Sequence, residues 1–240
     1  MDPFSASMLL LASIVFLALV TGTAMGFGSM VVTIVLGSHF FEIPFLLGVM
    51  VPANLSISVY ILARHHRHVR WSFLGLGVLP AMSAGVVVGL LLFSFQDGSG
   101  LQLSFGVIVL FLASMELWRM RSSAVQKPLP RWLSLAALAG AGVIHGLFAS
   151  GGPLAVYAIS RQLPDKQQFR ATLCALWTVL NFGLLVVYLA TGVVTKETGI
   201  TSGMMVVSIL GGIAVGEWLH GKLHGKWFRG SVFVLLALGS

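Results

Sequence analysis

The sequence predicts an all-α, polytopic bundle of transmembrane helices built from two inverted repeats. Three observations favour this fold class: an apolar composition, hydrophobic stretches of membrane-spanning length, and an order of elements that occurs twice. Of the 240 residues, 57% are hydrophobic and 9% are charged, with a mean hydropathy of +0.97, whereas about a quarter of a typical soluble domain is charged. Residues 46–63, 73–95 and 173–191 approach or exceed the ~20 apolar residues that a helix needs to cross a bilayer.

The basic residues lie in loops, which argues against a nucleic-acid partner. All of the 14 Lys and Arg residues fall between apolar stretches or near the end of the chain, and all except Lys196, which stands beside Glu197, belong to clearly basic loops. The positive-inside rule places such loops in the cytoplasm, and the loops around Glu42, Asp97 and Lys196 on the opposite side. The net charge of +7 therefore indicates topology, and we expect an inner (plasma) membrane protein surrounded by lipid.

Both ends of the chain carry apolar segments. Residues 4–20 have no basic segment before them and no small-residue cleavage signature after them, so we expect mature structure rather than a cleaved signal. The apolar stretch 231–238 ends abruptly, which suggests a last helix cut short.

The order of elements in residues 1–120 recurs in residues 132–240, after a cytoplasmic linker at 121–131. A shift of 120 residues superposes Gly22 on Gly142, Gly26 on Gly146 and Pro44 on Pro164, as an internal repeat requires. Each repeat is expected to contain a broken segment and three helices, at about 5–38, 44–63, 72–95 and 101–119 in the first and 132–160, 170–191, 199–219 and 230–240 in the second.

The two repeats are expected to be inverted relative to each other. A basic loop follows the helix at 44–63, whereas the nearly neutral sequence TKETG follows the helix at 170–191. Before these helices the charges are reversed: the loop FFEIP before the first helix is acidic, and the loop RQLPDKQQFR before the second is basic. Inverted repeats are typical of secondary transporters, because two equivalent halves rocking about a central site give one state open to each side.

Each broken segment is too long for one span and too short for two, which would need about 40 residues. We interpret each as a hairpin of two short helices, re-entrant or barely spanning, broken at the Gly-rich stretches 22–30 and 142–153. Irregular backbone at membrane depth is tolerated where protein covers it or where it lines a wet cavity. The breaks therefore predict a substrate cavity.

The break in the second hairpin has the composition of an anion site. Pro153 suits the first turn of a helix, so Ser150, Gly151 and Gly152 would precede a helix N-terminus whose free amides attract anions. Gly28 and Ser29 would supply the equivalent in the first hairpin. The alternative is that the glycines only allow helices to pack closely.

Other polar residues of the apolar segments are candidates for the same cavity. His145, which can exchange a proton near neutral pH, would bind the anion or couple its transport to protons, unless it is a neutral interhelical hydrogen-bonding residue. Asn54 and Asn181 would line the cavity or hydrogen-bond between helices. Arg170 would hold an oxyanion at the cytoplasmic mouth, or act as an ordinary positive-inside anchor.

The sequence offers little sign of a metal, a cofactor or catalysis. The cluster His65, His66 and His68 lies in a basic loop without a neighbouring carboxylate or thiol, so we expect no metal site. No nucleotide-binding, zinc-protease or hydrolase motif occurs. We expect no catalytic residues and no cofactor.

At its two hairpins the chain resembles the sulfite exporter TauE/SafE family, also called the toluene sulfonate uptake permeases. The resemblance rests on LVTGTAMGFGSMVV and on GVIHGLFASGGPLAVYAISRQLPDKQQFRATL, and extends over essentially the whole chain. The first hairpin departs from the family pattern, because no proline follows GFGSM. The resemblance implies a secondary transporter of small sulfur-containing anions, such as sulfite, sulfoacetate or another organosulfonate, in a bacterial plasma membrane.

We therefore expect a transporter that carries a small anion by alternating access, with the anion held between the two breaks. A gated anion channel is a competing interpretation, and a membrane-embedded enzyme that uses His145 is a more distant one. The sequence leaves open the direction of transport, the coupling ion and whether the protein forms a homo-oligomer.

Overall fold

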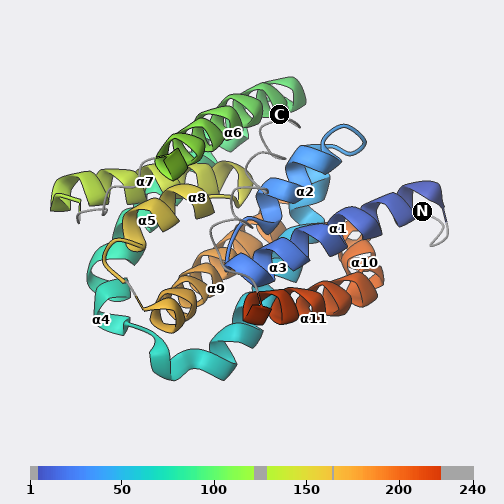
Figure 1. Cartoon of the computed structure of the whole chain (residues 1–240). Helices are drawn as coiled ribbons and strands as arrows, with labels where there is room; N and C mark the ends of the chain where they lie inside the picture. The colour runs from blue at the N-terminus through green and yellow to red at the C-terminus, as the bar shows by residue number, and fades with distance from the viewer. Residues whose placement is uncertain (1–4, 122–128, 164, 223–240) are drawn as a thin grey trace. The chain divides into compact units, whose positions relative to one another are not determined.

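The computed structural model describes residues 5–121, 129–163 and 165–222, and every regular element in these ranges is a helix. The predicted all-helical fold is thereby confirmed, while the helix expected at 230–240 and most of the linker at 121–131 lie outside the described residues. The helices are α1 (Ala6–Met25), α2 (Ser29–Gly37), α3 (Ile43–His65), a 3-10 turn (His66–His68), α4 (Trp71–Phe73), a π-helix (Leu74–Val78), α5 (Leu79–Phe95), α6 (Gly98–Arg121), α7 (Arg131–Phe148), α8 (Gly152–Ile159), α9 (Lys166–Thr191), α10 (Lys196–Met204) and α11 (Val206–Lys222) (Figure 1).

Five segments of the described chain are long and apolar enough to cross a membrane. They are Ala6–Met25, Ile43–His68, Trp71–Phe95, Arg131–Phe148 and Gln167–Thr191. A sixth span results if α10 and α11, which meet at a bend of 51°, are counted together. The protein is therefore a polytopic membrane protein.

The two arms of each hairpin are unequal, unlike the pair of short helices expected from the sequence. The first arms, α1 and α7, have 20 and 18 residues, whereas the second arms, α2 and α8, have 9 and 8. The first arms are longer because Gly22 stays helical within α1 and Gly142 and Gly146 stay helical within α7. Of the four hairpin arms, the two second arms are too short to cross the membrane.

The chain forms two compact units, each described here by itself. The first unit contains residues 1–53, 97–123 and 188–240, and the second contains residues 54–96 and 124–187. Two of the boundaries fall inside α3 and α9, and each unit combines segments from both halves of the chain. The expected repeats 1–120 and 132–240 remain a prediction about the sequence and do not coincide with these units.

In the second unit, α5 packs along α7 through two pairs of glycines. A Cβ atom added to Gly85 or Gly89 of α5 would lie 2.9 Å from the Cα atom of Gly142 or Gly146 of α7, respectively. Because both positions advance by four residues, the two helices run in the same direction. Small residues four apart allow this close approach of backbones in a membrane.

In the first unit, α11 packs along α1 in the same manner (Figure 1). A Cβ atom added to Gly212 would lie 2.8 Å from the Cβ atom of Leu19, and one added to Gly216 would lie 2.6 Å from that of Thr23. One turn further, the Nδ1 atom of His220 lies 2.7 Å from the carbonyl oxygen of Ala24. This pair of helices is also parallel.

Candidate functional site

The break of the second hairpin lies between α7 and α8, within the second unit. Ala149 ends α7 in a left-handed conformation with φ of 51°, and its N–H donates to the His145 carbonyl at 2.7 Å. Gly151 then precedes α8, and Pro153 occupies its first turn. The predicted sequence of break, proline and short helix is confirmed.

The N-terminus of α8, predicted from the sequence as an anion cradle, is buried and has no side-chain cap in the described structure. No side chain caps its first amides among the described residues, since Gly151 stands at the capping position. Ser150, Gly151 and Gly152 are all buried, with 6% of Ser150 exposed. Uncapped amides at the start of a helix carry a partial positive charge and need a hydrogen-bond acceptor.

Gly151 also has a packing role at the break. A Cβ atom added there would lie 2.2 Å from the carbonyl oxygen of Ala141 and 3.0 Å from the Cβ atom of His145. The break is therefore folded tightly against α7, and only glycine fits at this position.

His145 is buried beside this break without a polar partner. Only 1% of the residue is exposed, and neither ring nitrogen has a hydrogen-bond partner within the described part of the chain. Its ring stacks on Trp177 of α9, with centroids 5.3 Å apart and planes inclined by 25°. The alternative in which His145 is hydrogen-bonded between helices thus finds no support among the described residues. A buried polar group without a partner costs about 1–3 kcal/mol, which a ligand acceptor would relieve.

One face of α9 brings two further candidates to the same side as the Trp177 ring. Arg170 and Asn181 are buried, with 8% and 5% exposed. Asn181 lies one turn beyond Trp177, about 6 Å along the axis, and Arg170 lies two turns before it, about 10 Å. The oxygen of the Asn181 amide has no hydrogen-bond partner among the described residues. Arg170 is thus unlike a solvated anchor, although its role at the site stays a prediction.

The first hairpin contributes a similar break in the first unit. Gly28 precedes α2 with φ of 97°, and no side chain caps α2 in the described structure. A Cβ atom added to Gly22 of α1 would lie 2.8 Å from the Cβ atom of Ser29, so the two arms meet closely here. Since Gly28 and Ser29 belong to one unit and Ser150–Gly152 to the other, an anion site formed jointly by both breaks stays a prediction.

Asn54 lies in α3, two residues after Pro52, at the start of the second unit. It is buried, with 8% exposed, and it takes part in an interaction within the described protein. A role in the cavity therefore stays a prediction, as does a role between helices.

Two features of this region were missed by reasoning from the sequence. Trp177 was not a candidate, although its spacing from Arg170 and Asn181 puts it on the same helix face. The G-x-x-x-G pair of α5, Gly85 and Gly89, is the partner of the pair in α7. For Gly142 and Gly146, close packing is therefore observed.

No group of three His, Cys, Asp or Glu side chains within the described residues is arranged to hold a metal ion. The loop histidines His65 and His68 have ring centroids 6.3 Å apart, and belong to no such group.

We expect Ala149→Val to lower the free energy of unfolding by about 2 kcal/mol, because a β-branched residue is strained in the left-handed region. Ala149→Gly is the matched control and should change it by less than about 1 kcal/mol, since glycine adopts this conformation freely. Denaturant unfolding of the purified protein measures both changes. Equal stability of the two variants would contradict the conformation of Ala149.

Comparison with known proteins gives an independent measure of relationship. The model of the sulfite exporter TauE/SafE family matches residues 10–240. A probable inner membrane transporter protein TsaS from Comamonas testosteroni is 25% identical over 171 residues, which cover 71% of this chain and 70% of that protein. No solved structure matches the chain. Since the family model covers nearly the whole chain, this membrane protein belongs to the sulfite exporter TauE/SafE family.

Proposed function

We propose that the protein is a secondary transporter that moves a small sulfur-containing anion, such as sulfite, sulfoacetate or another organosulfonate, across a bacterial plasma membrane. The observation that carries the proposal is the break between α7 and α8, where His145 packs its Cβ atom beside Gly151 at an uncapped helix N-terminus and where neither of its ring nitrogens has a hydrogen-bond partner among the described residues. The family's description as sulfite exporters and the name of the relative, an inner membrane transporter, support the same class.

The chemistry of the break suits a compact oxyanion. The backbone amides of α8 and one ring N–H of His145 can donate hydrogen bonds to the oxygens of a sulfite or sulfonate. The amide of Asn181 adds a further donor if its oxygen and nitrogen exchange places, which leaves the shape of the side chain unchanged. Arg170, two turns away on α9, would attract the anion electrostatically from the predicted cytoplasmic side.

The pairing of helices supports two equivalent halves. In each unit the long arm of a hairpin packs in parallel against a glycine-containing helix from the other half of the chain, α5 with α7 and α11 with α1. The glycine-containing helices α5 and α11 also occupy equivalent places in the predicted repeats. An inverted repeat, in which the halves exchange conformations, would allow alternating access.

A gated anion channel would use the same donors without alternating access. The two mechanisms differ in kinetics, because a transporter saturates with substrate and responds to a gradient of a coupled ion. A membrane-embedded enzyme is disfavoured by chemistry: the break offers His145 and Ser150 but no carboxylate next to them in sequence.

The proposal is tested by uptake of radiolabelled sulfite, sulfoacetate, taurine and toluene sulfonate into proteoliposomes. We expect saturable uptake of at least one of these anions, with its KM raised about 10-fold or more by Arg170→Gln, because this change removes the buried positive charge that attracts the anion toward the site. Arg64→Gln is the control, since Arg64 is exposed and bonded to Tyr60 at 2.6 Å.

Three other outcomes are informative. Uptake that does not saturate would favour the channel. An equal effect of Arg170→Gln and Arg64→Gln would remove Arg170 from the site. Failure of every anion to bind or move, with folded protein and over a range of pH, would reject the anion proposal.

A further inference from the structure

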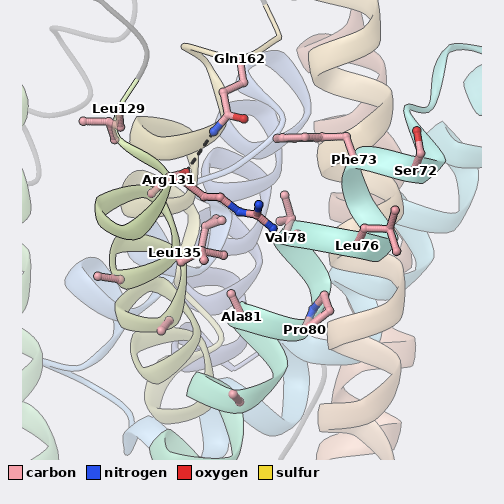
Figure 2. A pocket seen from close by; sticks show the side chains of 16 residues that line it. Ser72, Phe73, Leu76, Val78, Pro80, Ala81, Leu129, Arg131, Leu135 and Gln162 are labelled. Atoms are coloured by element: carbon pink, nitrogen blue, oxygen red, sulfur yellow. Dashed lines mark hydrogen bonds between the residues drawn. The ribbon is translucent and has the colours of Figure 1, made fainter.

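A groove of about 890 Å³ opens between the beginnings of α5 and α7 in the second unit. Its walls come from α4, the π-helix and the first turns of α5 on one side, and from the first three turns of α7 on the other (Figure 2). Gln162, which follows α8, closes one end. None of the residues proposed for the anion site lines this groove, so it is a separate cavity.

The groove is polar at one end and apolar at the other. Its polar residues lie near the starts of α4 and α7 or in the loop after α8: Ser72, Arg131, Ser134 and Gln162. Its deeper walls are apolar, formed among others by Val78, Ala81, Ala84, Leu138 and Ala139. Because α5 and α7 run in parallel, this order is the same on both walls. From Arg131 to Ala139 the apolar wall extends about 12 Å along α7.

Arg131 supplies the only charge among the described lining residues. Figure 2 shows its side chain reaching across the groove toward Val78 of the π-helix. The described residues provide no ion-pair partner for this guanidinium, and no carboxylate is present in the described lining. Gln162 donates from Nε2 to the Ser134 hydroxyl at 3.0 Å, which fixes a second polar side chain at this end. The polar end therefore attracts an anion.

The polar end lies at the level expected for lipid headgroups. The apolar spans Trp71–Phe95 and Arg131–Phe148 both begin there. Trp71 and Trp132 are 57% and 71% exposed at these starts, and tryptophan is enriched where a membrane meets water. The basic loop before Trp71 places this end on the predicted cytoplasmic face, where anionic lipids gather around basic residues.

We propose that this groove binds an anionic phospholipid, with its phosphate at Arg131 and Gln162 and one acyl chain along the apolar walls. A groove with one cation above an apolar channel, where the described residues give that cation no ion-pair partner, fits a molecule that combines an anion with a hydrocarbon chain. A zwitterionic lipid is a poorer match, because its own cation would lie near Arg131. The π-helix lines the groove at Leu76, Gly77 and Val78, and π-helical turns occur frequently at functional sites.

The structure provides matched variants for a test. A Cβ atom added to Gly77 or to Gly75 would meet nothing within 4 Å, so either position has open space where a side chain begins. Only Gly77 lines the groove, so Gly77→Leu fills it and Gly75→Leu is the control in the same π-helix. Arg131→Gln removes the charge, and Arg67→Gln in the exposed turn His66–His68 is the matched control.

The experiment measures binding of dioleoyl phosphatidylglycerol to delipidated protein by native mass spectrometry, with dioleoyl phosphatidylcholine and glycerol 3-phosphate in parallel. We expect saturable binding of phosphatidylglycerol, at least 10-fold tighter than that of phosphatidylcholine. Arg131→Gln and Gly77→Leu should each weaken it about 10-fold, while Arg67→Gln and Gly75→Leu leave it unchanged. Glycerol 3-phosphate alone should bind more weakly than the whole lipid.

Several results would overturn the proposal. Equal binding of phosphatidylglycerol and phosphatidylcholine would show that the lipid charge does not contribute to binding. Binding of glycerol 3-phosphate as tight as that of the lipid would show that the acyl chain does not contribute. An equal loss of phosphatidylglycerol binding in Gly75→Leu and Gly77→Leu would show that the groove is not the binding site. Anion uptake is measured separately, in liposomes that contain either lipid. A protein without the lipid site would still transport the anion, so failure of the lipid proposal is distinguishable from failure of the transport proposal.

Discussion

Replacement of His145 by leucine is expected to weaken anion binding about 30-fold without destabilising the protein. The binding loss corresponds to about 2 kcal/mol, the contribution of one hydrogen bond to a charged group. The free energy of unfolding should stay the same or rise by about 1 kcal/mol, because leucine removes two buried ring nitrogens that have no partner in the described structure. A gain in stability with a loss of binding is the mark of a group retained for function.

Isothermal calorimetry measures the first change and denaturant unfolding the second. His145→Gln keeps a donor at this position and should lose less affinity than His145→Leu. If His145 were only a packing partner of Trp177, the leucine variant would bind the anion as well as the original protein. Uptake with and without a pH gradient separates the two roles left open for His145, since a residue that relays protons changes the response to the gradient and a simple donor does not.

Replacement of Gly146 by valine should strongly lower the free energy of unfolding. A Cβ atom there would lie 2.4 Å from the carbonyl oxygen of Val86 and 2.9 Å from the Cα atom of Gly89. These contacts are with backbone atoms of α5, which cannot rotate away, so the helices must separate. We expect a loss of about 3 kcal/mol or more, at the upper end of overpacking effects.

Unfolding in denaturant, or the yield of monodisperse protein where the variant does not fold, measures this loss. Gly183→Val in α9 is the control, because a Cβ atom at Gly183 would meet nothing within 4 Å. A Gly146→Val protein as stable as the control would contradict the parallel packing of α5 against α7. Gly142→Val should behave like Gly146→Val, since its Cβ atom would lie 2.2 Å from the Met82 carbonyl oxygen.

The sequence alone was sufficient to predict the all-helical fold class, the membrane location and the family. These follow from apolar stretches and from the residues around Ser150–Pro153, which are local signals. The local break at α8 was also predictable, because the conformational preferences of glycine and proline do not depend on distant residues.

The partners of the helices were not predictable in this way. A G-x-x-x-G pattern is the same whether its glycines approach a ligand or another helix, and only the position of α5 shows that Gly142 and Gly146 meet a backbone. For the same reason the roles of His145 could not be distinguished from the sequence. Its burial against Trp177, 32 positions along the chain, arises from tertiary packing.

The pairing of α1 with α11 has a consequence for biosynthesis. Thr23 and Gly216, which meet in the folded protein, are separated by 216 − 23 = 193 positions, so at ~5–20 residues per second the ribosome needs roughly 10–40 s to make the second after the first. During that time α1 lies in the bilayer without its partner α11. Early loss of nascent chains to membrane quality control is therefore to be expected wherever translation pauses before α11.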